Sequence, residues 1–310
     1  MSARVSATSV ATPRTIVMVQ AQAPVSGRRR PSWLGRLIRR APVVLCLAVL
    51  ATMVAIAVTA PLIAPHDPYR QSLDSRLRPP VWSGGSLVHP LGTDQLGRDI
   101  LSRLFFGARV SLAVGVVVVL IAGVTGIVAG LFAGFYGGTI DEIIMRLADL
   151  RLSLPFFLLV IAVIHVFGPS LVTLIWVLGL TSWVPYARIL RAEVMSIRER
   201  EFVSAAQALG ATDRRLMFRH ILPNAIASAI VIGSLELANI IVVESALSFL
   251  GLGVQSPMPS WGNMLGEGRD YMMTSWWLAA FPGCAIAIAA VAVNVFGDGL
   301  RDVLDPHLET

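Results

Sequence analysis

Long apolar stretches separated by short polar segments dominate this chain. A helix needs about 20 apolar residues to cross a bilayer. Six stretches meet or approach that length, and they lie near residues 43–63, 110–135, 150–168, 170–187, 225–250 and 276–297. The pattern therefore predicts an all-α, polytopic membrane protein with six transmembrane helices.

The segment from Glu201 to Asn224 interrupts this pattern, because it is polar and Arg-rich but keeps a helical period. Phe202, Ala206 and Leu209 are spaced i, i+4 and i+7, which predicts the apolar face of a short helix. The segment is too polar to cross a bilayer, and this face is too apolar to lie in water alone. We therefore expect it to bind a protein partner.

A glycine is expected to divide this segment into two short helices. Gly210 follows the first helix at the position where a left-handed residue commonly ends a helix. Thr212 or Asp213 can cap the second helix, and Pro223 suits the first turn of the helix that follows. The second helix carries Leu216, Met217 and Phe218.

Composition supports a membrane protein and argues against an enzyme. Hydrophobic residues make up 55% of the 310 residues, charged residues only 14%, and the mean hydropathy is +0.72. The chain contains no lysine, so it has no Walker A site and cannot hydrolyse ATP by the P-loop route. Catalytic, zinc-spaced and EF-hand motifs are also missing from the sequence, so we expect no catalytic residue, cofactor or metal ion on this chain.

The placement of the arginines behind the net charge of +6 indicates the orientation of the chain in the membrane rather than binding of nucleic acid. Arginines with no acid among them precede the first apolar stretch, and seven more lie between Arg188 and Arg219. Positive charge marks cytoplasmic segments, so both regions are expected on the cytoplasmic side. An even number of spans then places both termini there.

Several motifs resemble the permease subunits of ABC importers. Ser204-Ala205-Ala206, then Gly210 and His220-Ile221-Leu222-Pro223, resemble the cytoplasmic coupling loop that docks into an ATPase subunit. Other motifs resemble the second permease subunit of dipeptide, oligopeptide and nickel importers, the DppC/OppC-like branch, from about residue 33 onward. They are His89-Pro-Leu-Gly-Thr-Asp94, Gly97-Arg-Asp-Ile-Leu-Ser-Arg103, Leu247-Ser-Phe-Leu-Gly-Leu-Gly253, Trp261-Gly262 and Gly297-Asp-Gly-Leu-Arg-Asp302. One departure is Ser204, where many importer permeases carry a glutamate.

The resemblance implies a type I ABC importer permease fold in a bacterial cytoplasmic membrane, with both termini cytoplasmic. The implied activity is import of dipeptides or oligopeptides by alternating access, with nickel, haem and peptide-like conjugates as alternative substrates. The implied partners are a second homologous permease, two ATPase subunits or domains that hold ATP and Mg, and an extracytoplasmic substrate-binding protein.

The resemblance also divides the chain and names residues for ATPase coupling. Residues 1–32 are expected to form a disordered cytoplasmic tail, and 33–107 a membrane-surface helix, the first span and an external loop. Residues 108–302 form the core domain with a coupling loop at 192–223, and 303–310 a cytoplasmic tail. The residues expected to serve in coupling are Phe202, Ser204, Ala205, Ala206, Gly210, Arg214, Arg215, Phe218, His220 and Pro223.

Polar residues inside the fifth span are candidates for the translocation path. Glu236, Asn239 and Glu244 lie where a charged side chain costs about 2.5 to 3.5 kcal/mol on insertion scales, so they should face protein or water. The alternative is a buried hydrogen-bond network that ties helices together. A stand-alone secondary transporter would also explain these residues, but it gives no role to residues 201–224.

Small and aromatic residues suggest further contacts. Ala122, Gly126, Gly130 and Gly134 form a stripe for close helix packing, either within this chain or between subunits. Residues 97–106 are expected to form an amphipathic helix at the membrane border, which either receives a binding protein or caps the structure. Trp261, Trp276 and Trp277 are expected to anchor the external loop at the interface.

Overall fold

A computed structural model describes residues 41–304, and within that range helices and loops account for the whole architecture apart from one isolated bridge between Thr93 and Asp99. The predicted tail 1–32, the predicted surface helix from Trp33 to Arg40 and residues 305–310 lie outside the described part. The helices are α2 (Ala41–Ile63), α3 (Ile100–Tyr136), α4 (Gly138–Ser153), α5 (Phe156–Phe167), α6 (Leu171–Thr181), α7 (Val184–Arg198), α8 (Glu201–Ala208), α9 (Asp213–Arg215), α10 (Leu222–Phe249), α11 (Trp261–Gly268) and α12 (Trp277–Leu304). A π-helix, Leu216–Ile221, joins α9 to α10, and short 3₁₀ turns lie at Leu73–Ser75, Val81–Ser83 and Arg269–Tyr271.

Five helical stretches in the described part are long and apolar enough to cross a membrane, which confirms a polytopic all-α fold. They are Pro42–Ile63, Ile100–Tyr136, Leu171–Arg198, Asp213–Phe249 and Trp277–Asp302. Each coincides with a predicted apolar stretch. The count reaches six when α4 and α5, which bend by 89° where they meet, are taken as one span.

The apolar stretch predicted near 150–168 is not one continuous helix. Pro155 lies at the break, and Leu154 before it has an extended ψ of 128°. A residue before proline disfavours the helical region, so the helix ends there and α5 starts in a new direction. With 12 residues, α5 is about 18 Å long and cannot cross a bilayer alone.

The predicted surface helix at 97–106 is instead the first part of α3. Asp99 caps α3, because its carboxylate accepts a hydrogen bond from the Ser102 amide at 2.8 Å. The apolar run that follows continues the helix without a break as far as Tyr136. The border segment and the second span are therefore one rigid element.

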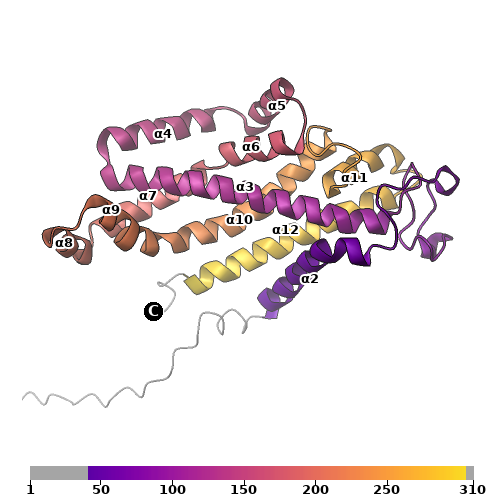
Figure 1. Cartoon of the computed structure of the whole chain (residues 1–310), viewed down its shortest axis with the longest axis horizontal. Coiled ribbons are helices and arrows are strands. Elements are labelled where there is room, and N and C mark those ends of the chain that lie inside the picture. Colours follow the sequence, from indigo (N-terminus) through magenta and orange to yellow (C-terminus); the bar gives the residue numbers. More distant parts are fainter. Residues whose placement is uncertain (1–40, 305–310) are drawn as a thin grey trace, which may run out of the picture.

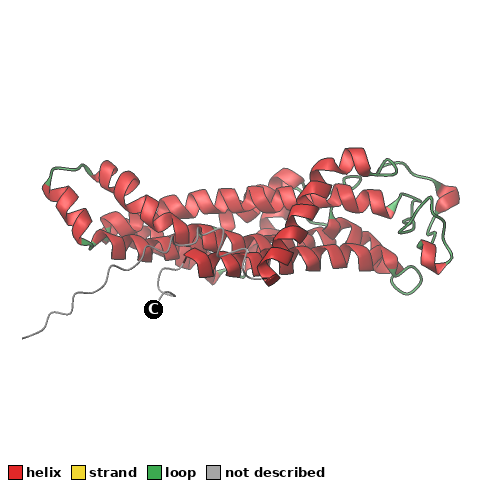
Figure 2. Cartoon of the chain, turned by 90° about the horizontal axis from the view of Figure 1, so that it is seen from below, coloured by secondary structure: helices red, strands yellow, loops and turns green. Residues whose placement is uncertain are grey.

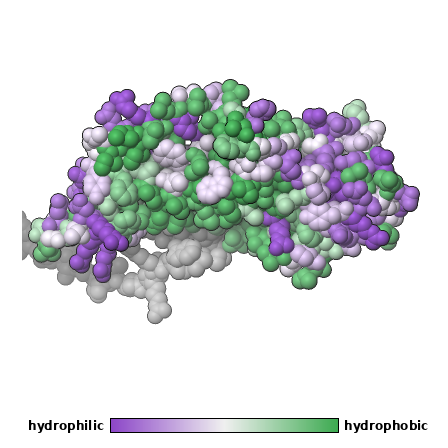
Figure 3. All heavy atoms as spheres, turned by 45° about the horizontal axis from the view of Figure 1, so that its top comes forward, coloured by the Kyte–Doolittle hydropathy of each residue, from purple (hydrophilic) through white to green (hydrophobic). Residues whose placement is uncertain are grey.

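The long helices run side by side along the long axis of the molecule (Figure 1). Helices α8 and α9 lie at one end, whereas α11 and the loop between α2 and α3 lie at the other; Figure 2 shows the same elongated shape. Apolar side chains cover the middle and polar ones gather at both ends (Figure 3). Exposed apolar residues such as Val58, Leu120 and Val291 fit a lipid-facing surface.

The small-residue stripe packs α3 against α7 within this chain. Of the two possibilities that the sequence left open, packing within the chain and packing between subunits, the structure shows the first for Gly126, Gly130 and Gly134. A Cβ atom built on Gly126 would lie 2.5 Å from the Trp183 carbonyl oxygen. At Gly130 it would lie 2.6 Å from the carbonyl oxygen of Ala187, and at Gly134 the same close approach recurs one turn farther on. These glycines let the two helix backbones come into direct contact.

At the end that carries α11, the charged motif residues form a buried cap. Arg98 Nε donates to Asp94 at 2.6 Å, and Arg98 Nη2 donates to Glu267 of α11 at 2.7 Å. Arg103 donates to both carboxylates from Nη1, and both arginines are 1% exposed. Of the two interpretations of residues 97–106, the structure supports the structural cap.

Two of the three predicted interface tryptophans are core residues instead. Trp261 is buried and its Nε1 donates to the Leu104 carbonyl at 3.1 Å, while Trp277 is buried and donates to the Thr93 carbonyl at 3.3 Å. Trp276 remains 46% exposed. A glycine follows Trp261 in the motif because α11 and α10 approach closely there: a Cβ atom on Gly262 would lie 2.6 Å from the backbone of Ser245 in α10.

Candidate functional site

The 201–223 segment lies at the tip of the molecule, beyond the ends of α3 and α7 (Figure 1). Helix α7 runs to Arg198, so the coupling loop expected at 192–223 starts inside a helix rather than after one. Helix α8 then leads to Gly210, and α9 continues through the π-helix into α10. The predicted second short helix is thus the beginning of one long helical stretch, Asp213–Phe249.

Gly210 makes the turn that the sequence predicts. Its φ of +83° lies in the left-handed region, and its amide donates to the Gln207 carbonyl at 2.9 Å. The Ala211 amide donates to the Ala206 carbonyl at 3.1 Å. These two bonds form a Schellman motif that ends α8 and turns the chain sharply. Thr212 occupies the next N-cap position without a side-chain cap bond.

A buried apolar cluster fixes the segment to α7. Val203 of α8 and Leu216, Met217 and Ile221 of the π-helix are all buried, and they pack with residues of α7. The i, i+4, i+7 pattern of Phe202, Ala206 and Leu209 does not include Val203. The sequence signal for it is the i, i+3 spacing of Val203 and Ala206, and both residues pack on this cluster.

Most residues expected to serve in coupling lie on the surface of this tip. Ala206 and His220 are half-buried, while the others are exposed: Phe202, Ser204, Ala205, Gly210, Arg214, Arg215, Phe218 and Pro223. Phe202 is 42% exposed, Phe218 50% and Leu209 89%. The surface therefore combines large apolar side chains with arginines, a composition typical of a protein interface core.

The tip connects directly to the membrane-spanning helices. Arg198, at the end of α7, donates from Nη1 to the Phe135 carbonyl of α3 at 2.7 Å. Arg191 pairs with Asp141 of α4 through two hydrogen bonds. Together with the glycine contacts of α3, these bonds make α7 a stiff link between the tip and the bundle.

The candidate path residues divide into two environments. Glu236 is half-buried and Asn239 is exposed, and the Asn239 amide donates to Glu236 at 3.5 Å. Glu236 also interacts electrostatically with Arg151 of α4. This arrangement keeps both groups accessible from one side of α10.

Glu244 is instead fully buried, so it is not part of an accessible surface in this structure. Ser248 Oγ donates to its carboxyl at 2.8 Å and Ser245 Oγ at 3.4 Å, and Ser111 and Ser260 also contribute hydrogen bonds. The carboxyl thus joins α10, α3 and the turn before α11. In this structure Glu244 therefore has the environment of the alternative interpretation, a buried network between helices, and its place in the path stays a prediction.

Two family models match this chain. The family model described as binding-protein-dependent transport system inner membrane component matches residues 126–310. A second model, the N-terminal TM domain of oligopeptide transport permease C, matches residues 32–80.

Curated relatives match most of the chain. The di/tripeptide transport system permease protein DppC of Pseudomonas aeruginosa is 45% identical over 254 residues, which cover 82% of this chain and 84% of the relative. The dipeptide transport system permease protein DppC of Haemophilus influenzae is 42% identical, covering 82% and 86%. That of Bacillus subtilis is also 42% identical, covering 84% and 81%.

Solved structures include one described as inward facing conformations of the MetNI methionine ABC transporter. The similarity has a TM-score of 0.49 at 18% identity and covers 64% of this chain and 94% of that chain.

Proposed function

The chain belongs to the family of binding-protein-dependent transport system inner membrane components, and from this premise we propose that it forms half of a path for dipeptides or other short peptides. The names of its curated relatives carry the proposal, since they are dipeptide permeases at 40–45% identity over more than four-fifths of the chain. A second, homologous permease supplies the other half. Nickel, haem and peptide-like conjugates are the alternative cargoes in this branch.

The tip formed by residues 201–223 is the proposed docking site for an ATPase subunit. Its exposed Phe202, Leu209 and Phe218 supply apolar area, and Arg214 and Arg215 supply charge. In this proposal the ATPase subunits hold ATP and Mg, and this chain binds neither. The tip and both termini lie in the cytoplasm of a bacterial cell, and the opposite end faces the substrate-binding protein.

The mechanism that follows is alternating access driven from the tip. ATP binding closes the ATPase pair and moves the two docked tips. Because α8 is fixed to α7 by Val203, and α7 is packed on α3 through the glycine stripe, a shift of the tip rotates these helices together. The two permeases then exchange an inward-open path for an outward-open one. Glu236 and Asn239 are the residues proposed to face that path.

The test uses matched phenylalanine substitutions in the reconstituted importer. Phe202→Ala and Phe218→Ala remove exposed side chains at the tip, whereas Phe157→Ala removes one that is 45% exposed on α5. We expect each tip variant to weaken docking of the ATPase subunit by about 10-fold, the loss of one interface anchor, and thereby to lower the number of peptides imported per ATP hydrolysed. The Phe157→Ala importer should retain its coupling. Equal coupling in all three variants would remove the tip from the mechanism.

The substrate class is tested separately on the binding protein. Di- and tripeptides should compete with one another for binding, whereas nickel and haem should not compete. Import of nickel with no response to peptides would retain the permease assignment and replace the cargo.

A further inference from the structure

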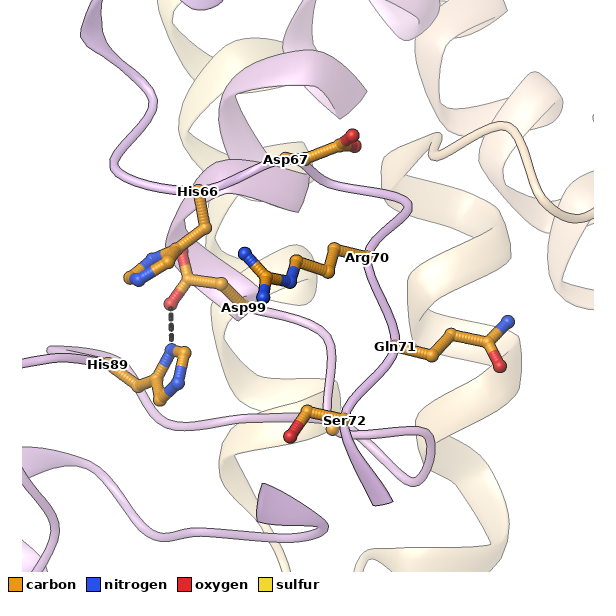
Figure 4. Close-up of a pocket in the computed structure, with 8 residues that line it drawn as sticks. His66, Asp67, Arg70, Gln71, Ser72, His89 and Asp99 are labelled. Atoms are coloured by element: carbon orange, nitrogen blue, oxygen red, sulfur yellow. Dashed lines mark hydrogen bonds and ion pairs between the residues drawn. The ribbon is translucent and has the colours of Figure 1, made fainter. Parts of the chain in front are cut away.

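Two histidines and an aspartate of the connection between α2 and α3 lie together in one pocket (Figure 4), and this connection lies at the end of the molecule opposite the tip (Figure 1). His66 follows α2, His89 lies in the loop, and Asp99 caps α3. One potential ligand atom from each lies within 4.8 Å of the others. They line a cavity of about 320 Å³, together with Asp67, Arg70, Gln71 and Ser72.

The distances suit a small tetrahedral ion. His89 Nδ1 lies 3.0 Å from Asp99 Oδ1, and His66 Nδ1 lies 3.9 Å from Asp99 Oδ2. Two ligands bound to zinc at its usual bond lengths are separated by about 3.3 Å. The observed distances lie on either side of that value, but they end on the two different oxygens of Asp99. One ligand atom of each residue lies within 4.8 Å of the others, so rotation of the His66 ring and of the carboxylate would be needed to bring both nitrogens and one oxygen around a single ion.

His66 provides an independent indication of a ligand. Its Nδ1 atom is buried, yet it has no hydrogen-bond partner. The backbone beside it is held, because the His66 amide donates to Ser102 Oγ at 3.0 Å. A buried polar atom without a partner is unfavourable, and a metal ion would satisfy it. The His66 and His89 rings lie 4.7 Å apart between centroids, so both are already gathered at one place.

Asp99 is oriented by a further shell of contacts. Its Oδ2 atom accepts from the Ser102 amide at 2.8 Å and from Ser102 Oγ at 2.7 Å. Such outer contacts commonly orient a metal-binding carboxylate. These contacts leave the other carboxylate oxygen, Oδ1, facing His89. A bound ion would replace the hydrogen bond that now joins Asp99 Oδ1 and His89 Nδ1.

We propose that His66, His89 and Asp99 bind a divalent transition-metal ion of the zinc class, which ties the loop after α2 to the first turn of α3. Two imidazoles and one carboxylate favour zinc and its neighbours over magnesium or calcium, which prefer oxygen ligands. The fourth position opens into the cavity and would hold water. The ligands lie 23 and 10 residues apart, so the sequence showed no zinc-type spacing.

Arg70 gives the proposal a distinctive control. It is exposed and lines the same cavity, so its charge opposes a bound cation. Removing that charge should raise metal affinity about threefold, the size of one screened charge interaction. A site that bound an anion would respond in the opposite direction.

The experiment titrates Zn²⁺ into the full chain, purified in detergent and freed of metal with a chelator. We expect one tightly bound ion per chain, and a d–d spectrum typical of tetrahedral nitrogen and oxygen ligands when Co²⁺ is used. His66→Gln and His89→Gln should each weaken binding by about 100-fold or more. His165→Gln, which changes an exposed histidine on α5, should bind like the parent chain.

Hydrogen exchange keeps the test decisive if a variant folds poorly. In the parent chain, Zn²⁺ should slow amide exchange in residues 64–103 and leave the 201–223 segment unchanged. No binding by the parent at micromolar Zn²⁺ would overturn the proposal. Equal binding by the His66→Gln and His165→Gln chains, or no change in exchange at 64–103, would overturn it as well.

Discussion

Gly130→Ala should destabilise the contact between α3 and α7, although alanine is the better helix former. The added Cβ would lie 2.6 Å from the Ala187 carbonyl oxygen, whereas ordinary contacts begin at 3.4 Å. The obstructing atom belongs to a helix backbone, so it cannot rotate away. The two helices must separate by about 0.8 Å at this point.

Two opposing effects determine how much Gly130→Ala changes the stability. Replacing glycine by alanine inside a helix gains about 1 kcal/mol. Overpacking a close contact costs about 1 to 3 kcal/mol. Gly123 provides the matched control on the same helix, because a Cβ there would lie 3.6 Å from the Tyr186 ring, an ordinary contact. Gly123→Ala should therefore show only the gain, and the two variants should differ by about 1 to 3 kcal/mol.

The assay is unfolding of the purified chain from mild detergent by sodium dodecyl sulfate, followed by tryptophan fluorescence. We expect the order of stability Gly123→Ala, parent, Gly130→Ala. Equal stability of the two variants would refute the claim that α3 and α7 touch through their backbones.

Three further pairs of substitutions test other parts of the structure. Gly210→Val should lower the stability of the turn by about 1 to 2 kcal/mol, because the left-handed backbone is strained for valine although there is space for its Cβ atom. Gly210→Asn should be tolerated, since asparagine also adopts this conformation. Limited proteolysis at the tip should cleave the valine variant faster, and equal protection of the two variants would contradict the turn. Arg103→Met should lower the free energy of unfolding by about 3 to 5 kcal/mol, because the buried carboxylates of Asp94 and Glu267 each lose a partner. Arg269→Met breaks only the exposed pair with Asp270, so it should lower this free energy by less than about 1 kcal/mol. Glu244→Ala should lower stability by about 1 to 3 kcal/mol because the Ser248 hydroxyl loses its acceptor, while Glu244→Gln retains an acceptor and most of the stability; equal losses would argue against the buried network.

The spans could be predicted because hydropathy depends on the local sequence alone. The apolar runs near 43–63, 225–250 and 276–297 correspond to α2, α10 and α12. The glycine turn at Gly210 was equally local, since a left-handed residue after a helix needs no distant contact to identify it.

What could not be predicted depends on contacts between distant segments. The sequence does not reveal that Trp277 bonds to the Thr93 carbonyl, so the tryptophan resembled an interface anchor. Glu244 resembled a path residue because its serine partners come from three different segments. A proline such as Pro155 disfavours a continuous helix, but the sequence does not give the 89° angle between α4 and α5, because α5 packs in one cluster with residues of α3, α6 and α10.

The most direct test of the central claim asks what the tip touches in the assembled importer. A photo-crosslinking amino acid is placed at Leu209, which is 89% exposed at the end of α8, or at Met273, which is 98% exposed between α11 and α12. Helices α8 and α11 lie at opposite ends of the molecule (Figure 1). We predict that position 209 captures an ATPase subunit and position 273 does not. Capture of the ATPase from position 273 with none from position 209 would contradict the account.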